Sequence, residues 1–313
     1  MRASGGQRIE WSVIAPDVRA SIEAMLDAPV IEARNQAGGF SPGLAARCLL
    51  ADGRRAFVKA VSPDQNPAAV AIHRREAEIA RRLPPDLPVP RFLGVVDDGH
   101  WVALVFDEVA GTQPDEPWTD TQLGAVLPAL QRFAEQVTPT PVPELETFED
   151  RYAAVFDGWR RLAGGDGDPS SYGQDVVTAV DRLSALEVGW AEASAGDTLL
   201  HTDLRADNLL LTPDGGVVLV DWPWACTGAA FLDLVLLLPS VGLGGGPDPA
   251  TVIERYSLFA DVDPDALLAV VTALAGFFVR QSLDPAPPGL PTVRAFQRAQ
   301  AEVALHWLLP TLR

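Results

Sequence analysis

The stretch LLHTDLRADNLLLTPDGGVVLVDWPWA, residues 199–225, gathers side chains that suit metal binding and proton transfer. Its two short apolar runs, LLLT and VVLV, are joined by the turn sequence PDGG, which predicts a β-hairpin. Asn208 precedes the first run and Asp221 follows the second, so pairing would place them on strands about 5 Å apart. One amide and one carboxylate leave room for phosphate oxygens and water, the mixture of ligands that Mg²⁺ prefers. The alternative is that both residues only cap the ends of the hairpin.

Asp203 lies in the loop that leads into this hairpin, five residues before Asn208. Its carboxylate would therefore lie at the same end of the hairpin as the candidate metal ligands, where it can accept a proton from a hydroxyl group. Together with His201, these residues form a far more specific pattern than a glycine motif alone.

Lys59, in the strand-like run RAFVKAV, is the only lysine among 313 residues. Side chains alternate along a strand, so Lys59 would share a face with apolar neighbours, where an ammonium group needs an anionic partner. Glu76 offers one, because it is the only charge on an apolar stripe of the following helix. That stripe consists of Ile72, Glu76, Ile79, Ala80 and Leu83. We expect Lys59 and Glu76 to form a buried ion pair near phosphates bound by a glycine-rich turn; alternatively, Lys59 extends to solvent from the surface.

The first third of the chain carries the strand and hairpin signals that would position the lysine. The segment EARNQAGGFSPGLAARCLLADGRRAFVKAV predicts three strands, joined by a glycine-rich turn at residues 38–43 and by a DG turn. A helix should follow, with Asn66 as its N-cap and Pro67 in its first turn, and should end at Pro84. Two further strands, FLGVVDD and WVALVFDEV, complete this part.

Helical segments predominate after Gly111, apart from the hairpin. We expect helices over residues 121–136, 148–163, 175–193, 250–259, 264–281 and 291–308. A strand-rich part with one helix, followed by a helical remainder, predicts an α+β fold of two lobes with a cleft between them. The expected domains are residues 1–109 and 110–313.

Composition restricts the class of protein further. With 48% hydrophobic and 21% charged residues, the chain has the composition of a folded, soluble protein. The net charge of −18 argues against a nucleic-acid partner and favours a cationic ligand, although an acidic, solvated surface is the simpler explanation. No run approaches the roughly 20 apolar residues of a membrane span, and the first residues lack the apolar segment of a signal peptide. Because Cys48 and Cys226 fit no metal or disulfide pattern, we expect a cytoplasmic protein that contacts no membrane.

The segments HTDLRADN and VDWPWA resemble the catalytic loop and metal motif of the aminoglycoside phosphotransferase family. That family belongs to the protein-kinase-like superfamily, together with the choline kinases. The upstream segments GGFSPG, FVKA and RREAEIARRL stand in the matching order. The resemblance is strong for residues 199–238, moderate for residues 38–83, and fades over the C-terminal helices. It implies a protein-kinase-like bilobal fold, with a small antiparallel-sheet N-lobe that binds nucleotide and a larger, mainly helical C-lobe.

The resemblance implies a role for each matching residue. Asp203 would orient the acceptor hydroxyl group and take its proton. Asn208 and Asp221 would hold Mg²⁺. Lys59, positioned by Glu76, would contact the α- and β-phosphates of the nucleotide.

Supporting roles follow in the same way. His201 would brace the catalytic loop, a role that is close to that of an ordinary core histidine. Asp233 matches an aspartate that hydrogen-bonds this loop; the alternative is a charge at the start of a helix. The segment LVFDEVAG matches the hinge, where backbone groups of Glu108 and of Val109 or Ala110 would meet the nucleobase.

The chain departs from related kinases in two places. Its glycine-rich turn lacks a clean G-x-G-x-x-G pattern, and Gly43 and Ser41 are the expected phosphate contacts there. Arg205 stands two residues after Asp203, where protein kinases place a lysine that meets the γ-phosphate. It would either hold the transferred phosphoryl group, or bind Asp207 or lie at the surface.

The implied activity is that of a small-molecule kinase. It would use ATP or GTP with Mg²⁺ to phosphorylate a hydroxyl group of an antibiotic or metabolite, as a monomer or homodimer. A cationic aminoglycoside, and hence antibiotic resistance, fits the family and the acidic charge. A protein kinase is disfavoured because no A-P-E sequence follows Asp221. The alternative from another class is a catalytically silent nucleotide-binding protein that acts through partners, which predicts loss of a base or metal ligand.

The acceptor is the part of the function that the sequence leaves open, because the C-terminal helices carry no recognised acceptor motif. Acidic candidates for the acceptor site are Asp157, Glu254 and Asp284. Trp159, Trp224 and Trp307 either line an acceptor pocket or belong to the core.

Overall fold

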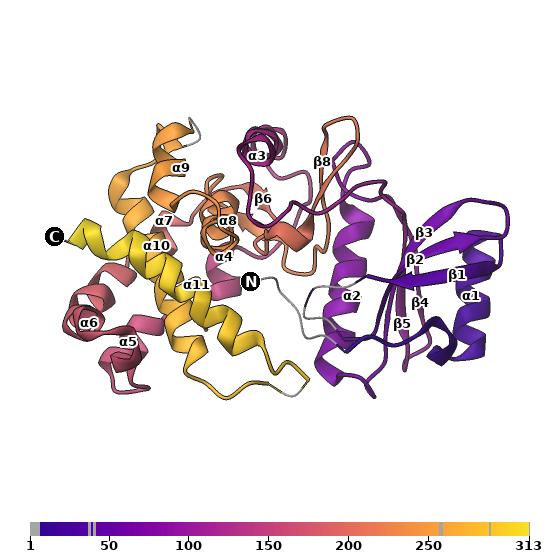
Figure 1. The fold of residues 1–313 in the computed structure, drawn as a ribbon, viewed down its shortest axis with the longest axis horizontal. Helices are drawn as coiled ribbons and strands as arrows, with labels where there is room; N and C mark the ends of the chain where they lie inside the picture. Colours follow the sequence, from indigo (N-terminus) through magenta and orange to yellow (C-terminus); the bar gives the residue numbers. More distant parts are fainter. Residues whose placement is uncertain (1–6, 37–38, 40–41, 257–258, 288, 313) are drawn as a thin grey trace.

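The computed structural model describes residues 7–36, 39, 42–256, 259–287 and 289–312. Figure 1 shows two lobes: a β-sheet flanked by α1 and α2 forms the smaller lobe, and helices dominate the larger one. The predicted α+β fold, with an antiparallel-sheet lobe and a helical lobe, is confirmed.

The smaller lobe is built on a five-stranded antiparallel sheet in the order β1-β2-β3-β5-β4. Its elements are α1 (Pro16–Leu26), β1 (Val30–Asn35), β2 (Leu44–Leu50), β3 (Arg55–Val61), α2 (Pro67–Arg82), β4 (Phe92–Asp97) and β5 (Val102–Asp107). The five strands and α2 lie where the sequence predicts them. The sequence pattern did not reveal α1, whose Val18, Ile22 and Leu26 pack under one face of the sheet.

Side-chain alternation along β3 separates the two faces of the sheet. Val58 and Ala60 pack in the apolar cluster that contains α1, whereas Val61 and the partly buried Phe57 pack in the cluster that contains α2. Lys59 lies between Phe57 and Val61 in this alternation, on the strand at the centre of the sheet. The fold thus places the single lysine on the face that α2 covers.

The start of α2 is fixed as the sequence predicts. The Asn66 side-chain oxygen accepts hydrogen bonds from the backbone N–H groups of Ala68 and Ala69, at 2.8 and 3.2 Å. Pro67 occupies the first turn. Such a cap stabilises a helix by about 1 kcal/mol and defines where its turns begin. Glu76, on the inward stripe, is 3% exposed.

The two lobes are joined by direct bonds beside the cleft. Arg75 of α2 donates from Nε to the Pro223 carbonyl oxygen (2.7 Å) and from Nη2 to the Ala225 carbonyl oxygen (3.1 Å). The segment after β5 pairs with the larger lobe, because Thr112 and Leu211 exchange backbone hydrogen bonds of 3.0 and 2.8 Å. These contacts hold α2 and the linker against the predicted catalytic segment.

The larger lobe contains nine α-helices and two short two-stranded sheets within the described residues. The helices are α3 (Asp120–Gln136), α4 (Phe148–Tyr152), α5 (Gly158–Ala163), α6 (Gln174–Glu187), α7 (Trp190–Ala193), α8 (Leu232–Leu243), α9 (Pro249–Arg255), α10 (Pro264–Ser282) and α11 (Val293–Leu308). The sheets pair β6 (Thr198–Leu200) with β9 (Cys226–Gly228) and β7 (Leu209–Leu211) with β8 (Val217–Leu219).

Two predicted helices are interrupted. Residues 148–163 form α4 and α5 instead of one helix, and residues 175–193 form α6 and α7. At the start of α5, Gly158 packs so closely on α10 that a Cβ atom there would lie 2.1 Å from the Gly276 carbonyl oxygen. Helical periodicity does not report such backbone packing, so the sequence missed the break.

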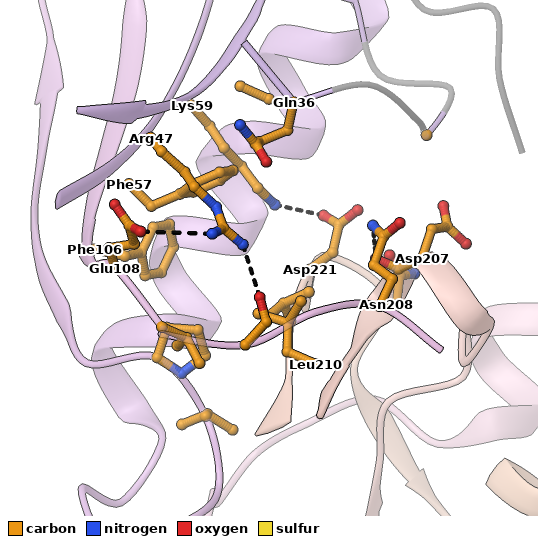
Figure 2. Close-up of a pocket in the computed structure, with 18 of the residues that line it drawn as sticks. Gln36, Arg47, Phe57, Lys59, Phe106, Glu108, Asp207, Asn208, Leu210 and Asp221 are labelled. Carbon is orange, nitrogen blue, oxygen red and sulfur yellow. Dashed lines mark hydrogen bonds and ion pairs between the residues drawn. The ribbon is translucent and has the colours of Figure 1, made fainter. Parts of the chain in front are cut away.

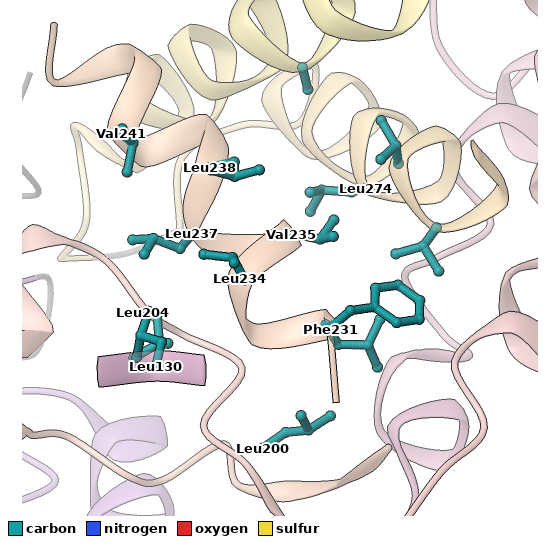
Figure 3. Packing of buried hydrophobic residues seen from close by; sticks show 14 of the residues in the cluster. Leu130, Leu200, Leu204, Phe231, Leu234, Val235, Leu237, Leu238, Val241 and Leu274 are labelled. Atoms are coloured by element: carbon teal, nitrogen blue, oxygen red, sulfur yellow. The ribbon is translucent and has the colours of Figure 1, made fainter. Parts of the chain in front are cut away.

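Helix α8 lies in the middle of the larger core, which Figure 3 shows from close by. Leu234, Val235, Leu237 and Leu238 point in different directions from this helix, and each is at most 2% exposed. A helix that is buried all round lacks the polar face that produces a 3.6-residue pattern. This explains why the helical pattern used in the sequence analysis gave no bounds for α8.

Helix α10 is long and apolar enough to cross a membrane by length and composition, in contrast to the expectation from the sequence. Of its most apolar window, 61% is buried inside the protein. It packs against α5, α6, α7 and α11. This is the environment of a core helix.

Candidate active site

The predicted hairpin is formed by β7 and β8, which pair Leu209 with Leu219. The ladder continues beyond the strands, because the Val220 N–H donates to the Asn208 carbonyl oxygen at 3.0 Å. Asn208 and Asp221 therefore lie at the same end of the hairpin, and both line one cavity. Figure 2 shows their side chains close together on the larger-lobe side of this cavity, with Asp221 directed toward Lys59 of the smaller lobe.

Lys59 forms the expected ion pair with Glu76 and a second ion pair with Asp221. Its Nζ atom lies 2.6 Å from Glu76 Oε1 and 2.7 Å from Asp221 Oδ1. Only 15% of the Lys59 side chain and 4% of the Glu76 side chain are exposed, so both charges depend on this pairing. The contact with Asp221 connects the sheet of the smaller lobe to the hairpin of the larger lobe.

The two carboxylates that share Lys59 differ in acidity. Burial would raise the pKa of Asp221, but the charge of Lys59 and the hydrogen bond that it donates lower this pKa to about 2. Burial raises the pKa of Glu76 to about 7, although Lys59 opposes the rise. Asp221 is thus the carboxylate that stays ionised and can share its charge with a cation.

Asp233 and His201 hold the loop that carries Asp203. Asp233, in the first turn of α8, accepts hydrogen bonds from the backbone N–H groups of His201 (2.8 Å) and Thr202 (2.7 Å). Both alternatives considered for Asp233 in the sequence analysis therefore apply: it lies at the start of a helix, and it accepts hydrogen bonds from the loop. His201 Nδ1 accepts from the Asp203 N–H at 3.2 Å, and Nε2 lies 2.9 Å from the Val220 carbonyl oxygen. This bonding assigns the ring proton to Nε2, and burial lowers the pKa of His201, which keeps the ring neutral.

Arg205 pairs with two aspartates. It binds the Asp203 carboxylate through Nη1 and the Asp207 carboxylate through Nε (3.0 Å) and Nη2 (3.1 Å). Burial raises the pKa of Asp203 to about 6; Arg205 opposes this rise, and the charges of Asp221 and Asp207 add to it. Asp203 is ionised at neutral pH, yet more basic than an ordinary aspartate, which suits a group that accepts a proton.

The side chains at the end of the hairpin fit a hard cation. Asn208 Nδ2 donates to the Asp203 carbonyl oxygen at 2.7 Å, so its amide oxygen is the atom left for a ligand. The ionised Asp221 supplies a second oxygen donor. No cluster of three or more His, Cys, Asp or Glu with metal-binding geometry occurs among the described residues. Two oxygen donors fit a Mg²⁺ ion that takes its other ligands from phosphates and water.

The cavity lined by these residues has a volume of about 500 Å³. One end of the cavity carries three charged side chains and one amide, those of Lys59, Glu76, Asp221 and Asn208. Aromatic rings from β3 and β5 line it on the other side, beside the charged pair of Arg47 and Glu108 (Figure 2). These rings belong to Phe57 and Phe106. An apolar slot beside a cation and two oxygen donors suits a molecule with a flat ring at one end and phosphates at the other.

Only some of the hinge and glycine-turn residues that were expected to contact the nucleotide line this cavity. Glu108 and Val109 line it, whereas Ala110 is not among its lining residues. Gly43 does not line it either: it packs on β3, where a Cβ atom would lie 2.3 Å from the Ala60 carbonyl oxygen. Position 43 therefore requires glycine because the backbone packs closely on β3 there. Ser41 lies outside the described residues.

Two arginines that the sequence analysis did not single out also line this cavity. Arg8 forms a parallel bridge with Gly43, donates from Nε to the Gln36 carbonyl oxygen (3.3 Å), and feels the charge of Asp221. Arg47 of β2 donates from Nη2 to the Gly111 carbonyl oxygen at 3.0 Å. Arg47 interrupts an apolar strand as Lys59 does, and this signal was available in the sequence. Arg8 had no comparable signal.

A second, larger cavity of about 940 Å³ lies on the other side of the loop. Asp203 and Arg205 line it, and Asp221 lines both cavities. Half of its lining residues come from α4, α10, α11 and the loops beside them, and most of the others come from the start of α2 and from the segments around Asp203 and Asp221. The proton-accepting candidate thus faces one space and the metal-binding candidates face the other.

Only one of the residues proposed for the acceptor site lines this second cavity. Trp224 does, whereas Trp159 and Trp307 belong to the buried core. Asp157, Glu254 and Asp284 are not among its lining residues, and Asp284 pairs with Arg280 at 2.6 Å.

A sequence model described as the phosphotransferase enzyme family matches residues 39–268 of the chain. A comparison with curated protein sequences gives no match.

Several antibiotic kinases of known structure have a fold similar to that of this chain. The chain is 14% identical to a thermostable mutant of aminoglycoside phosphotransferase APH(4)-Ia in complex with AMP-PNP and hygromycin B, with a TM-score of 0.62 over 95% of this chain and 99% of that one. Spectinomycin phosphotransferase APH(9)-Ia, in complex with ADP and spectinomycin, gives 14% identity and a TM-score of 0.61 over 95% and 99%. Amicoumacin kinase hAmiN, with AMP-PNP, Ca²⁺ and its antibiotic, gives 14% identity and a TM-score of 0.54 over 94% and 95%. At these identities the structures establish the fold.

Proposed function

Because the chain belongs to the phosphotransferase enzyme family, we propose that it transfers the γ-phosphoryl group of ATP or GTP to a hydroxyl group of a small molecule. The observation that carries this proposal is the meeting of two cavities at one aspartate. Asp221 lines both, with Lys59 and Asn208 on one side and Asp203 on the other. A nucleotide in the first cavity and an acceptor in the second would approach each other at this point.

The smaller cavity suits the nucleotide. Its aromatic walls, Phe57 and Phe106, would enclose the base, and backbone groups near Glu108 and Val109 would bind the base edge. Lys59, held by Glu76 at 2.6 Å, would present its charge to the phosphates. The fold relatives were solved with AMP-PNP or ADP, which supports this assignment.

Asn208 and Asp221 would hold Mg²⁺ through their side-chain oxygens. When bound, the ion neutralises charge on the phosphate oxygens during transfer. Contacts within the protein hold both residues in position. The backbone ladder of the hairpin sets the distance between them, and the hydrogen bond from Asn208 Nδ2 to the Asp203 carbonyl oxygen (2.7 Å) fixes the orientation of the amide.

Asp203 would act as the proton acceptor. As the acceptor oxygen forms its bond to the γ-phosphorus, the hydroxyl proton passes to the Asp203 carboxylate. The bond between the γ-phosphorus and the bridging oxygen breaks, and the nucleoside diphosphate leaves. Arg205, paired with Asp203 and Asp207, would hold this carboxylate in place, and its charge lies beside the transferred group.

The test is substitution of Asp203 in purified protein supplied with Mg²⁺, ATP or GTP, and a panel of hydroxylated acceptors. We expect Asp203→Asn to lower the transfer rate by about 10²–10⁴-fold, the usual contribution of a general base, with unchanged nucleotide affinity. Asp207→Asn is the matched control: it removes the neighbouring carboxylate on Arg205 and should cause a far smaller loss. Transfer that survives Asp203→Asn would contradict the assignment. Tight nucleotide binding with no transfer by the unaltered protein would favour the catalytically silent alternative.

A further inference from the structure

The second cavity has an aromatic and apolar wall. Six aromatic side chains line it: Tyr152, Phe156, Trp224, Phe277, Phe278 and Phe296. Four of them form a connected row: ring centroids lie 5.1 Å apart for Tyr152 and Phe156, 5.8 Å for Phe156 and Phe277, and 5.1 Å for Phe277 and Phe278. Faces of this kind bind ring systems through buried apolar area and stacking.

Carboxylates are scarce in this wall. Among the described residues that line the cavity, Asp203 and Asp221 are the only acidic ones. Both have partners already, since Asp203 binds Arg205 and Asp221 lies 2.7 Å from Lys59. The net charge of −18 therefore does not describe this site. A polycation bound here would bury ammonium groups without carboxylates to receive them, which is strongly unfavourable.

The cations of the cavity are also paired. Arg151 binds Glu146, with a bond of 2.8 Å from Nε, and its guanidinium lies 5.6 Å from the centre of the Trp224 ring. Arg205 is held by two aspartates. The cavity thus leaves no strong charge of either sign unpaired, and such a site favours an uncharged ligand.

Among the described residues of the wall, one fully buried side-chain polar atom lacks a partner. Gln300 of α11 is 3% exposed and lines the cavity, and its Oε1 atom accepts no hydrogen bond. A buried amide oxygen without a donor is unfavourable by itself. The side-chain oxygens of Gln281 and Gln297, by contrast, each accept from Arg294 Nη1 at 2.8 Å. Gln300 is therefore the group that a ligand donor would satisfy.

We propose that the acceptor of this phosphotransferase is an uncharged alcohol with a large aromatic or fused-ring body, which donates a hydrogen bond to Gln300. This inference rests on the proposed function for the identity of the acceptor site. The apolar body lies against the aromatic wall, and the reacting hydroxyl group reaches Asp203. The cavity of about 940 Å³ holds a drug-sized molecule. Polycationic aminoglycosides are poor ligands for it.

The experiment measures binding to the full chain in the presence of Mg²⁺ and a non-hydrolysable ATP analogue, by calorimetry. The uncharged probes are chloramphenicol, which carries an aromatic ring, and hydrocortisone, which has a fused-ring body; the polycationic probes are kanamycin and hygromycin B. We expect the best uncharged probe to bind at least about tenfold more tightly than either polycation, because unpaired buried charges oppose the latter. Tighter binding of a polycation, or no binding of any uncharged probe, overturns the inference.

Substitution of Gln300 identifies the site. Gln300→Leu should weaken the best uncharged probe by about 3- to 10-fold, the usual value of one hydrogen bond. Because this change removes an unpartnered polar atom, the Tm of the free protein should stay equal or rise, whereas loss of a merely structural residue would lower it. Gln174→Leu makes the same exchange at an exposed site of α6 and should leave binding unchanged. An unaltered affinity in Gln300→Leu overturns the role of Gln300.

Product analysis separates this inference from the proposed function. Asp203-dependent phosphorylation confined to the polycations would leave the proposed function intact and overturn the acceptor class. Binding of an uncharged probe through Gln300 without any Asp203-dependent transfer would support the ligand class and contradict the proposed function.

Discussion

The cavity between the lobes and the cavity beyond the catalytic loop share Asp221 but are built from different material. The first presents charges held in place by pairs, with Lys59 bound to Glu76 and Asp221 at 2.6 and 2.7 Å. The second presents aromatic rings on helices, and its charges are satisfied within the protein. Phosphate chemistry requires fixed charges in one geometry, whereas an apolar wall admits any ring system of suitable shape. If the proposed function holds, this contrast assigns the reaction and the choice of acceptor to separate sets of residues.

The strongest test of this separation is the removal of a metal ligand. We expect Asp221→Asn to lower transfer by about 10³-fold and to raise the Mg²⁺ concentration needed for half-maximal rate, because a bound cation contributes several kcal/mol to phosphoryl transfer. Chelation should abolish transfer by the unaltered protein, and added Mg²⁺ should restore it. Asp214→Asn changes an exposed carboxylate in the turn between β7 and β8 and is the control. Equal Mg²⁺ dependence in Asp221→Asn and the unaltered protein would remove Asp221 from the metal site.

The next largest effect is expected for Lys59→Arg. A planar guanidinium is wider than an ammonium group and cannot occupy the same point between Glu76 and Asp221, so transfer should fall by about 10²-fold. The reciprocal exchange, Arg34→Lys, alters an exposed position of β1, in the same sheet, and should leave kcat/KM unchanged. Rates and nucleotide affinities of Lys59→Arg that match the unaltered protein would show that the single lysine has no special role.

The charged cavity was largely predictable from the sequence because its residues stand out locally. Lys59 interrupts an apolar strand, Glu76 interrupts an apolar helical stripe, and the PDGG turn shows that Asn208 and Asp221 converge. The second ion pair of Lys59, with Asp221, was not predictable, because it depends on how the two lobes pack. Local patterns carry no information on that packing.

The apolar cavity was not predictable for a different physical reason. A phenylalanine that lines a pocket and one that fills the core have the same pattern in a helix. Phe277 lines the cavity, whereas Phe148, which packs in the same aromatic cluster, belongs to the core. The break between α4 and α5, which helps shape this wall, depends on the contact of Gly158 with α10. The helix boundaries in this lobe were therefore less accurate than the strands of the other lobe.

A smaller effect, confined to the nucleotide side, is expected for Arg8. Arg8 lines the charged cavity beside Gly43 and lies in the field of Asp221. If it faces the phosphates, Arg8→Gln should raise the KM of the nucleoside triphosphate by about tenfold, the value of a charge-assisted hydrogen bond, and leave the acceptor KM unchanged. The affinity for the nucleoside without phosphates should not change. Arg19→Gln, in α1, is the control. A matching loss of nucleoside affinity would assign Arg8 to the base end or to structure.

The smallest effect tests the apolar side by itself. Phe277→Leu keeps a buried apolar side chain but removes a ring that contacts Phe156 and Phe278 in the cavity wall. We expect the acceptor KM to rise by about 2- to 10-fold, the value of aromatic contacts, while the nucleotide KM stays constant. Phe148→Leu, in the same aromatic cluster but outside the cavity lining, should lower Tm without changing the acceptor KM. Because Asp221 is the only described residue that lines both cavities, a ring on α10 is not expected to contact the nucleotide. An equal change of both KM values in Phe277→Leu would show that the cavities are coupled and that their separation is wrong.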